Sequence, residues 1–585
     1  MASKLHKLII QNFRSIGNNP VEIDLSDIAI LVGPNNVGKS SILRAYEILM
    51  LDGSTEGYFT LEDFPNKIIN PEKQPLLELH TLVDKDSKPG SEWCQKFDEN
   101  YYLVKEKWAW GNIGAGDRFG FNFELGRWSN HDDKEMYPWG PANKAQSYRP
   151  YPHRISAFAT PEEQTDEFIK LLEAIVLQKL EDIKGKADSD YSLLLKNIVQ
   201  LQKVVVEQGK EEIGNLEEKL SNEVSKIFPN YKVEFDPKHS EPSQNAVQFF
   251  SEDSELRIGP KNGFMSTIEN QGSGSRRTLI WAALKLLSEQ GVKARPKGSR
   301  KKSADQISQI RGKLLLMDEP EICLHPKAIR EMKNTLYNLT EDSNWQVIIT
   351  THSPQFIDIS KDNTTIVRVD KKEGTENIQG TTLYRPDMVQ LGKDDKENLK
   401  FLNLIDPHVS EFFFGRKNVI VEGDTEYTAF NYLKALKPEK YTDLHVIRAR
   451  GKATIVSLAK ILNHFGSDYS ILHDTDKPLL VSGNKNPAWK SNENILEEVK
   501  KVSDGSEVRL VCSIINFEEA FLVTNYKDTK PYNALENMKK DIDSFKDVES
   551  LLDGLIDHEK ELPENAIEWS DINELKQIVN NKNAE

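Results

Sequence analysis

Two groups of residues in this 585-residue sequence have the types and spacing that phosphate chemistry requires. The first is the run GPNNVGKS from Gly33 to Ser40, which fits the pattern GxxxxGK[ST] between an apolar run and a helical pattern. In such a loop, backbone N–H groups and the lysine bind nucleotide phosphates, and the last hydroxyl is a magnesium ligand. The sequence therefore predicts a nucleotide site formed by Asn35, Gly38, Lys39, Ser40 and Ser41.

Two later apolar runs end in polar residues that suit the same site. The run LLLM precedes Asp318 and Glu319, so we expect a buried strand that ends in a carboxylate. Asp318 would bind magnesium, and Glu319 would orient or deprotonate the attacking water. The run WQVIITT ends at His352, a candidate sensor of the γ-phosphate, although a histidine at a strand end is more often a structural residue.

The second group consists of acidic residues that follow apolar runs in the last third of the chain. The acids form three sets within about 100 residues: Glu422 with Glu426, Asp474 with Asp476, and Glu518 with Glu519. Each set alone is typical of an ordinary turn. Together they favour one site for Mg²⁺ or Mn²⁺, which prefer oxygen ligands. Two such ions would activate water and stabilise the leaving oxygen of a phosphodiester. The predicted ligands are Glu422, Glu426, Asp474, Asp476 and either Glu518 or Glu519.

The elements that must position these residues can be read from hydrophobic patterns. The opening residues predict strands up to Val32 and a helix from Lys39. Residues 93–152 hold five of the nine tryptophans, and we interpret them as a β-rich lobe with core aromatics rather than a platform that stacks bases. Residues 160–228 have a narrow apolar stripe at helical spacing, which suits a helical hairpin or a dimerisation arm.

The remaining segments complete the predicted organisation. The basic segment from Lys293 to Lys302 is expected to be a solvated loop, with a phosphate-contacting loop as the alternative. Residues 371–410 are polar and typical of a connector, and a second α/β pattern begins at Lys417. Its four buried strands are expected in NVIVEG, LHVIRARG, YSILHD and VRLVCSI.

Composition narrows the function classes. The chain has 92 acidic and 76 basic residues and a net charge of −16, which argues against a surface that coats nucleic acid non-specifically but permits a local basic stripe. No apolar run approaches the ~20 residues of a membrane span, so we expect a cytoplasmic protein. Cys94, Cys323 and Cys512 are far apart, so neither a disulfide framework nor a cysteine zinc site is expected.

The residues of the first group resemble the ABC-type ATPase head of SMC, Rad50 and RecF proteins. The segment NFRSI also fits such heads, in which Arg14 would approach the nucleotide. The resemblance implies a signature loop that a second subunit supplies, and the matching segment NQGSGSRR contains Ser273 and Gly274. This segment differs from LSGGQ, and His325 stands where SMC heads carry an aspartate.

The residues of the second group resemble the Toprim fold of topoisomerases, primases and certain nucleases. The order of Glu422-Gly, Gly451-Lys and the DxD from Asp474 carries that resemblance. An ABC head followed by Toprim resembles the OLD-family nucleases, which include the nuclease subunit of the Gabija anti-phage system. That family implies a catalytic lysine in a Lys-Pro pair, which Lys530 matches, although by chemistry alone Lys530 would be a surface cation. It also implies dimerisation through the helical insert.

The predicted fold is therefore α/β and multidomain, with an ABC-type ATPase head, a helical insert and a Toprim domain. The expected limits are 1–159 and 234–375 for the head, 160–233 for the insert, 376–410 for the connector and 411–585 for the Toprim domain with its C-terminal helical part.

The predicted function is a metal-dependent DNA endonuclease that ATP regulates, in anti-phage defence. The expected cofactors are ATP and Mg²⁺ or Mn²⁺, and the expected partners are DNA, a second copy of the chain or more, and a helicase-like accessory subunit, with no membrane. The alternatives are an ATP-operated sensor that does not cut, or a Toprim ribonuclease that acts on tRNA. The candidate catalytic residues are Glu422, Asp474, Asp476, Lys530 and, for ATP, Glu319.

Overall fold

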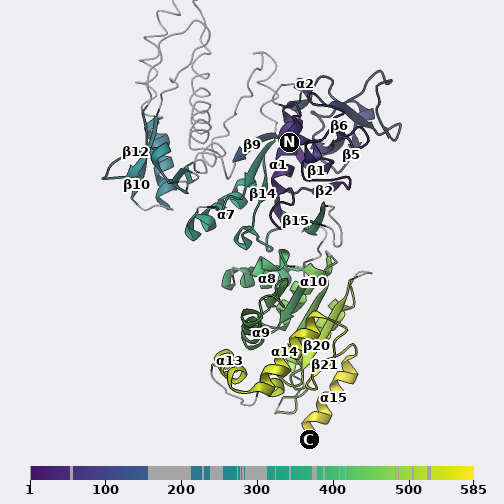
Figure 1. Ribbon diagram of the computed structural model, residues 1–585, viewed down its shortest axis with the longest axis vertical. Helices are drawn as coiled ribbons and strands as arrows, with labels where there is room; N and C mark the ends of the chain where they lie inside the picture. The colour runs from purple at the N-terminus through teal and green to yellow at the C-terminus, as the bar shows by residue number, and fades with distance from the viewer. Residues whose placement is uncertain are drawn as a thin grey trace, which may run out of the picture. The chain divides into compact units, whose positions relative to one another are not determined.

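The fold is known from a computed structural model, and Figure 1 traces the chain. Most of the predicted helical insert, the basic segment from Lys293, Ser273 and Cys323 lie outside the residues that the structure describes. The structure describes residues 2–52, 57–155, 213–226, 230–236, 255–272, 274–276, 278–279, 282, 312–322, 324–341, 344–371, 378–385, 389, 391–406, 409–415, 417–464, 466–480, 482–484, 486–502, 506–522 and 529–584.

The chain divides into two compact units, each described by itself. Unit one comprises residues 1–8 and 40–351, and unit two comprises residues 9–39 and 352–585. The predicted opening elements are confirmed, because three strands precede the helix that begins at Lys39. These elements are β1 (Lys4–Gln11), β2 (Val21–Asp24), β3 (Ile28–Val32) and α1 (Lys39–Met50).

Unit one contains an antiparallel sheet that confirms the predicted β-rich lobe. Trp93, Trp108, Trp110 and Trp139 are buried, as expected for core aromatics. The sheet is formed by β4 (Leu76–Val83), β6 (Tyr102–Ala109), β7 (Asp117–Asn122) and β8 (Arg127–Trp128), with β5 (Gln95–Lys96) paired to β6.

A buried ion cluster lies in this lobe. The Glu106 carboxylate accepts hydrogen bonds at 2.6 and 2.8 Å from Arg118 and at 2.8 and 2.9 Å from Arg149. Glu106 and Arg149 are fully buried. Burial opposes ionisation of Glu106, but the two guanidinium groups outweigh it and lower the pKa of this carboxyl. The cluster thus keeps a charge in the core because that charge is fully paired.

A parallel arrangement in unit one presents the predicted acidic strand end. Strand β13 (Lys313–Asp318) lies between β9 (Tyr151–Ile155) and β14 (Trp345–Thr350), parallel to both. In the register of β13 and β14, Asp318 lies opposite Thr350. Its aliphatic residues Leu314–Met317 are buried, as expected for a central strand. Unit one also contains α2 (Ala142–Gln146), β10 (Tyr231–Asp236), β11 (Glu255–Pro260), β12 (Ser266–Thr267) and α7 (Pro326–Thr340).

Unit two begins with a smaller β arrangement and continues into a five-stranded sheet. Strand β15 (Thr364–Lys371) pairs in parallel with β3 and antiparallel with β16 (Ile378–Tyr384), and α8 (Lys393–Ile405) follows. The four strands predicted after Lys417 are confirmed. The sheet has the order β18-β17-β19-β20-β21, with bounds Leu444–Arg448, Lys417–Val421, Tyr469–Asp474, Val508–Ser513 and Ala566–Glu568.

Neighbouring strands among β18, β17, β19 and β20 run parallel, and only β21 is antiparallel. The carboxyl ends of these four strands therefore meet at one edge of the sheet, where α/β proteins usually bind ligands. Apolar residues of β17, β19 and β20 form one core with the helices packed on them, among which α13 and α14 lie beside α9 (Figure 1). These helices are α9 (Asp424–Leu436), α13 (Lys530–Lys540) and α14 (Ile542–Ile556).

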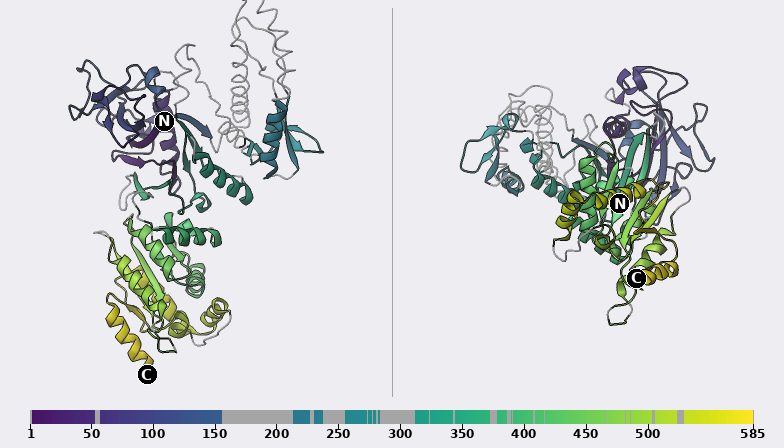
Figure 2. Two further views of the ribbon diagram at one scale, coloured as in Figure 1. Left: turned by 180° about the vertical axis from the view of Figure 1, so that it is seen from behind. Right: turned by 60° about the horizontal axis from the view of Figure 1, so that its bottom comes forward.

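The other helices of this domain are α10 (Lys452–His464), α11 (Pro487–Val499), α12 (Phe517–Phe521) and α15 (Ile572–Ala584). Figure 2 shows α15, in yellow, lying beside the strands near the C-terminus, and its Leu575 and Val579 are buried. Among the described residues, no helix combines the length and the apolar character needed to cross a membrane.

A carboxylate-lined candidate site

The acidic residues of the last third lie where parallel strands give way to helices. Glu422 follows β17 directly, and Glu426 is in the first turn of α9. Asp474 is the last residue of β19, and Glu518 is in α12, five residues after the end of β20. Because these strands are parallel neighbours, their ends bring carboxylates that are up to 96 positions apart in the sequence to one place.

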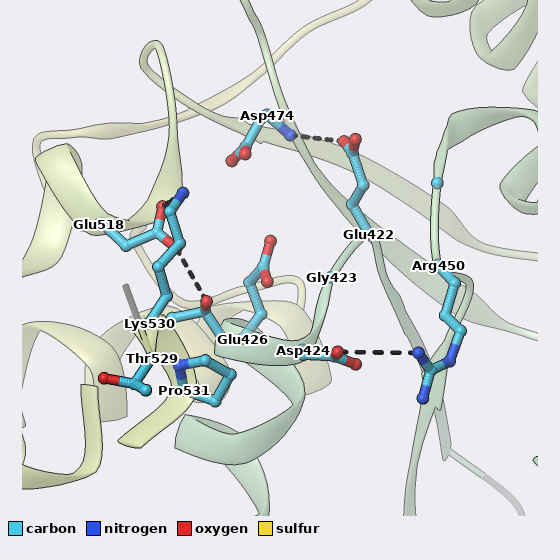
Figure 3. A pocket seen from close by; sticks show the side chains of 12 residues that line it. Glu422, Gly423, Asp424, Glu426, Arg450, Asp474, Glu518, Thr529, Lys530 and Pro531 are labelled. Atoms are coloured by element: carbon cyan, nitrogen blue, oxygen red, sulfur yellow. Dashed lines mark hydrogen bonds and ion pairs between the residues drawn. The ribbon is translucent and has the colours of Figure 1, made fainter. Parts of the chain in front are cut away.

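These four carboxylates line one pocket (Figure 3). The structure thus brings together four of the predicted ligands and adds Lys530 at the start of α13. In Figure 3, Glu426 lies between Lys530 on one side and Arg450 on the other. The lining residues are Glu422, Gly423, Asp424, Thr425, Glu426, Arg450, Gly451, Asp474, Glu518, Thr529, Lys530 and Pro531.

Hydrogen bonds fix three of the carboxylates. Glu422 Oε2 accepts the backbone N–H of Asp474 at 3.1 Å, and Asp474 Oδ1 accepts the backbone N–H of Phe517 at 2.9 Å. The Thr425 hydroxyl donates to Glu518 Oε1 at 2.8 Å. These bonds connect the ends of β17, β19 and β20, so the carboxylates are held by the fold itself.

The carboxylates of this pocket are difficult to ionise together. Burial raises the pKa of Glu422, and it raises the pKa of Glu426 to about 8, with further contributions from the negative charges of Glu422 and Glu518. Burial and the neighbouring Glu426, Glu422 and Glu518 also raise the pKa of Asp474 well above its ordinary value. Such mutual repulsion is what a divalent cation would relieve.

The donor chemistry of the pocket fits Mg²⁺ or Mn²⁺, since every candidate ligand is a carboxylate. Within the described residues, however, no three acidic, histidine or cysteine side chains already stand at ligand positions around a single point. Cation binding would therefore draw the carboxylates closer together. Without a cation, the mutual repulsion that raises their pKa values opposes this approach.

Asp476 is placed differently from the other predicted ligands. Its backbone has φ of +60°, and its carboxylate pairs with Lys452 Nζ rather than lining the pocket. Lys452 begins α10 and is buried. Asp476 nevertheless lies near enough to add to the charge that raises the pKa of Glu422. Its role as a metal ligand stays a prediction.

The structure separates Glu518 from Glu519. Glu518 is 6% exposed and lines the pocket, whereas Glu519 is exposed and its backbone N–H donates to the Asn516 side chain at the start of α12. Glu518 is therefore the residue that geometry favours as a ligand. Lys530 Nζ lies 3.3 Å from Glu518 Oε2, so this half-exposed lysine contacts a carboxylate of the pocket.

A buried histidine supports the Asp474 backbone. Trp569 Nε1–H donates to His473 Nε2 at 3.1 Å, so the proton of the neutral ring is on Nδ1, which donates to the Asp474 carbonyl at 2.8 Å. Burial and the charge of Lys452 lower the pKa of His473 to about 3, which keeps the ring neutral. No pattern in the sequence indicates this support, because Trp569 reaches His473 through the pairing of β21 with β20.

The phosphate loop has the backbone that the motif predicts. In unit two, Gly33 has φ of +138°, and a Cβ there would lie 2.0 Å from the Val369 carbonyl oxygen. Gly38 has φ of +91°, and Asn35 is exposed. Lys39 Nζ donates to the carbonyl of Gly33 at 2.8 Å and lies 3.0 Å from His352 Nε2. The predicted sensor histidine thus meets the lysine of the loop.

In unit one, the hydroxyl after that lysine meets the predicted magnesium carboxylate. Ser40 Oγ donates to Asp318 Oδ1 at 3.0 Å, and the Thr350 hydroxyl donates to the same oxygen at 2.6 Å. Glu319 has φ of +43°, and its backbone N–H donates to Thr350 Oγ1 at 3.0 Å. Ser41, which follows Ser40 in the sequence, is buried.

The remaining predicted nucleotide residues are described only in part. Ser273 lies outside the described residues, and the carbonyl of Gly274 accepts from the Thr278 hydroxyl at 2.9 Å. Arg14 has φ of +53°, and its guanidinium lies 5.5 Å from the centre of the Phe13 ring.

Comparison with known families decides the class of the chain. The profile described as an AAA ATPase domain matches residues 4–115 and 142–357, more than half of the sequence. The chain belongs to this AAA ATPase family. A second profile, described as an overcoming lysogenization defect (OLD) protein-like TOPRIM domain, matches residues 413–476. This second match includes Glu422, Glu426 and Asp474, and it ends before Glu518 and Lys530.

Three relatives that are named as nucleases resemble this AAA ATPase. The Old nuclease of Escherichia phage P2 is 26% identical over 555 residues, which covers 88% of this chain and 85% of the relative. The OLD nuclease of Thermus scotoductus is 22% identical over 516 residues, with 85% and 84% covered. Endonuclease GajA of Bacillus cereus is 26% identical over 271 residues, 39% of each chain.

Among solved structures, an SMC head bound to the C-winged helix domain of ScpA aligns with 65% of this chain at 16% identity and a TM-score of 0.38. The two family matches confirm the predicted combination of an ATPase head with a Toprim domain, and the relatives confirm the predicted OLD-family resemblance. The predicted domain limits and the dimerisation arm stay predictions.

Proposed function

We propose that this protein is a metal-dependent endonuclease that cuts DNA and that ATP regulates through its head. The observation that carries the proposal is the convergence of Glu422, Glu426, Asp474 and Glu518 from three strand ends in one pocket, with Lys530 beside them. The match of an OLD-like TOPRIM domain to the first three of these residues supports it, as do relatives that are nucleases by name.

The four carboxylates would hold Mg²⁺ or Mn²⁺, which would supply an activated water and stabilise the leaving oxygen of the phosphodiester. Lys530 would stabilise negative charge that develops on the phosphate or the leaving oxygen. Glu518 contacts both Thr425 and Lys530. Its Oε1 accepts a hydrogen bond from the Thr425 hydroxyl, and its Oε2 faces Lys530 Nζ. Asp476 would join the ligands only by leaving Lys452.

The head would bind ATP with magnesium. Lys39, Ser40, Ser41, Asn35 and Gly38 would contact the phosphates and the ion. Asp318 would bind the magnesium, Glu319 would orient water and His352 would sense the γ-phosphate. The exposed phosphate loop residues suit a homodimer, in which Ser273 and Gly274 of a second copy complete the site. A role in anti-phage defence, with a helicase-like accessory subunit, follows the OLD-family resemblance.

Neighbouring glutamates provide a matched test of the nuclease proposal. Supercoiled plasmid is incubated with wild type, Glu518→Gln or Glu519→Gln in Mg²⁺ and then in Mn²⁺. We expect wild type and Glu519→Gln to nick at similar rates, and Glu518→Gln to fall to background. Equal nicking by the two variants would contradict the assignment of Glu518, and no nicking by wild type under either metal would favour the sensor alternative. A parallel reaction with tRNA tests the ribonuclease alternative.

The contribution of the head is tested separately. Lys39→Ala is expected to abolish ATP binding, measured by equilibrium dialysis, and to remove any effect of ATP on the nicking rate. Because Lys39 is not in the carboxylate pocket, metal-dependent nicking without ATP should persist. If ATP still altered nicking by Lys39→Ala, the regulatory role of this loop would be wrong.

A further inference from the structure

Arg450 is a pocket residue that the proposed chemistry does not use. It follows β18 by two residues and lies across the pocket from Lys530 (Figure 3). Its side chain is 33% exposed. Arg450 is thus a second cationic side chain of the pocket, in addition to Lys530, that could bind an anion.

The backbone around Arg450 is held in an uncommon conformation. Arg450 has φ of +58°, which side chains with a Cβ rarely adopt, and Gly451 follows with φ of +129°. Two hydrogen bonds tie this turn to the end of β17: Ala449 N–H donates to the Val421 carbonyl at 2.9 Å, and Gly451 N–H donates to the Glu422 carbonyl at 3.1 Å. Such a conformation at a pocket is a reason to look for function.

The ion pairs of Arg450 leave its guanidinium available. Its Nη1 lies 3.7 Å from Asp424 Oδ2, which is its only ion pair with an acidic residue among the described residues. Arg448, in contrast, is engaged by two carboxylates, at 2.9 Å from Asp424 and 3.0 Å from Asp406. Asp424 therefore has a close partner in Arg448 and holds Arg450 loosely.

We propose that Arg450 binds the backbone phosphate next to the one that is cut, so that the pocket holds two consecutive phosphates of the nucleic acid. This inference rests on the proposed nuclease function and deepens it. A guanidinium matches a phosphate through two parallel hydrogen bonds, and its charge would offset the repulsion between the neighbouring phosphate and the carboxylates. Asp424 competes with that phosphate for the guanidinium.

The salt dependence of DNA binding tests this proposal. A fluorescent duplex is titrated with full-length protein in Ca²⁺, with binding measured by anisotropy at several salt concentrations. Each phosphate contact contributes about 0.9 to the slope of log K against log salt for duplex DNA. We expect Arg450→Asn to bind on the order of 10-fold more weakly, with a slope smaller by about 0.9, because asparagine tolerates positive φ but carries no charge. A slope equal to that of wild type would overturn the proposal.

Two further variants separate charge from structure. Arg450→Lys keeps the charge and should keep the wild-type slope, which a purely structural role of the arginine would not predict. Asp424→Asn removes the competing carboxylate and should tighten binding several-fold. Lys546→Gln on α14 removes an exposed cation outside the pocket and should change neither quantity. Weaker binding by Asp424→Asn would also count against the competition.

The outcome of this test is distinct from the outcome of the nicking test. If wild type binds DNA and nicks plasmid but Arg450→Asn has the wild-type slope, only the second phosphate site is wrong. If wild type binds with the expected slopes but nicks nothing, the nuclease function fails and Arg450 remains a phosphate contact. If wild type binds no DNA, both proposals fail.

Discussion

The backbone N–H of Asp474 donates to the Glu422 carboxylate at 3.1 Å, although 52 positions separate the two residues in the sequence. This bond joins the ends of two adjacent parallel strands, β17 and β19. It shows that the acids after β17 and the acids at the end of β19 meet at one edge of the sheet. The pocket therefore depends on the sheet itself, and the following predictions test what its carboxylates do.

The raised pKa values predict that the metal-free protein loses stability as pH rises. Glu422, Glu426 and Asp474 each have a raised pKa in the folded protein, so the folded state binds more protons than the unfolded state between the two pKa values. Their contribution is present below pH ~4 and, for Glu426, is lost as pH rises to about 8. Thermal unfolding in EDTA from pH 5 to pH 8 measures this effect.

The matched variant for that experiment is Glu426→Gln, which cannot ionise. Its free energy of unfolding in EDTA should fall less between pH 5 and pH 8 than that of wild type, because a tenfold difference in acidity between the folded and unfolded states corresponds to about 1.4 kcal/mol. It should also gain less stability from added Mg²⁺. Parallel pH curves for the two proteins would mean that Glu426 is not the buried acid that the structure describes.

Lys530 is expected to act on the reaction and not on the fold. Lys530→Gln should slow plasmid nicking by on the order of 100-fold, because a charge that stabilises the transition state is lost. Lys539→Gln is the control, since Lys539 is on the same helix and similarly exposed, at 45% against 47% for Lys530. Similar rates for the two variants would return Lys530 to the status of a surface cation.

The buried cluster in unit one predicts a large effect on stability. Glu106→Gln would leave Arg118 and Arg149 buried without their counter-charge and should lower the free energy of unfolding by about 3–5 kcal/mol. Glu124→Gln in the same lobe changes an exposed side chain and should have an effect within about 0.5 kcal/mol. Urea unfolding of the two variants measures the difference.

The strands and most of the pocket could be predicted from the sequence for a physical reason. Apolar runs that end in acids imply parallel strands whose carboxyl ends coincide, so Glu422, Asp474 and one of Glu518 and Glu519 are expected to converge. The spacing of Glu426 after Glu422 was equally informative, because a helix places it one turn on.

The sequence could not separate Glu518 from Glu519, because the turn before α12 is irregular. Ile515 has φ of +66°, and this residue resets the direction of the chain before the helix begins. Helical spacing counted from β20 therefore gives no phase for the two glutamates. The structure separates the two glutamates, because Glu518 is buried and accepts a hydrogen bond from the Thr425 hydroxyl, whereas Glu519 is exposed.

Arg450 and Asp424 were missed for a similar reason. Nothing in the run RARGK predicts that Arg450 has positive φ or that the turn is tied to the end of β17. Asp424 lies in the sequence between Glu422 and Glu426, which the strand and helix pattern favours as ligands. The pairing of Asp424 with Arg448 and Arg450 depends on the alignment of β17 with β18. Asp476 was expected in the pocket, but its turn directs it to Lys452.

The central claim is that the carboxylates at the strand ends hold divalent cations. Mn²⁺ uptake without nucleotide, followed by electron paramagnetic resonance of the free ion, tests this claim most directly. Wild type should take up Mn²⁺, and Asp474→Asn should take up at least 10-fold less at the same free concentration, while Glu519→Gln should match wild type. Equal uptake by wild type and Asp474→Asn would contradict the account.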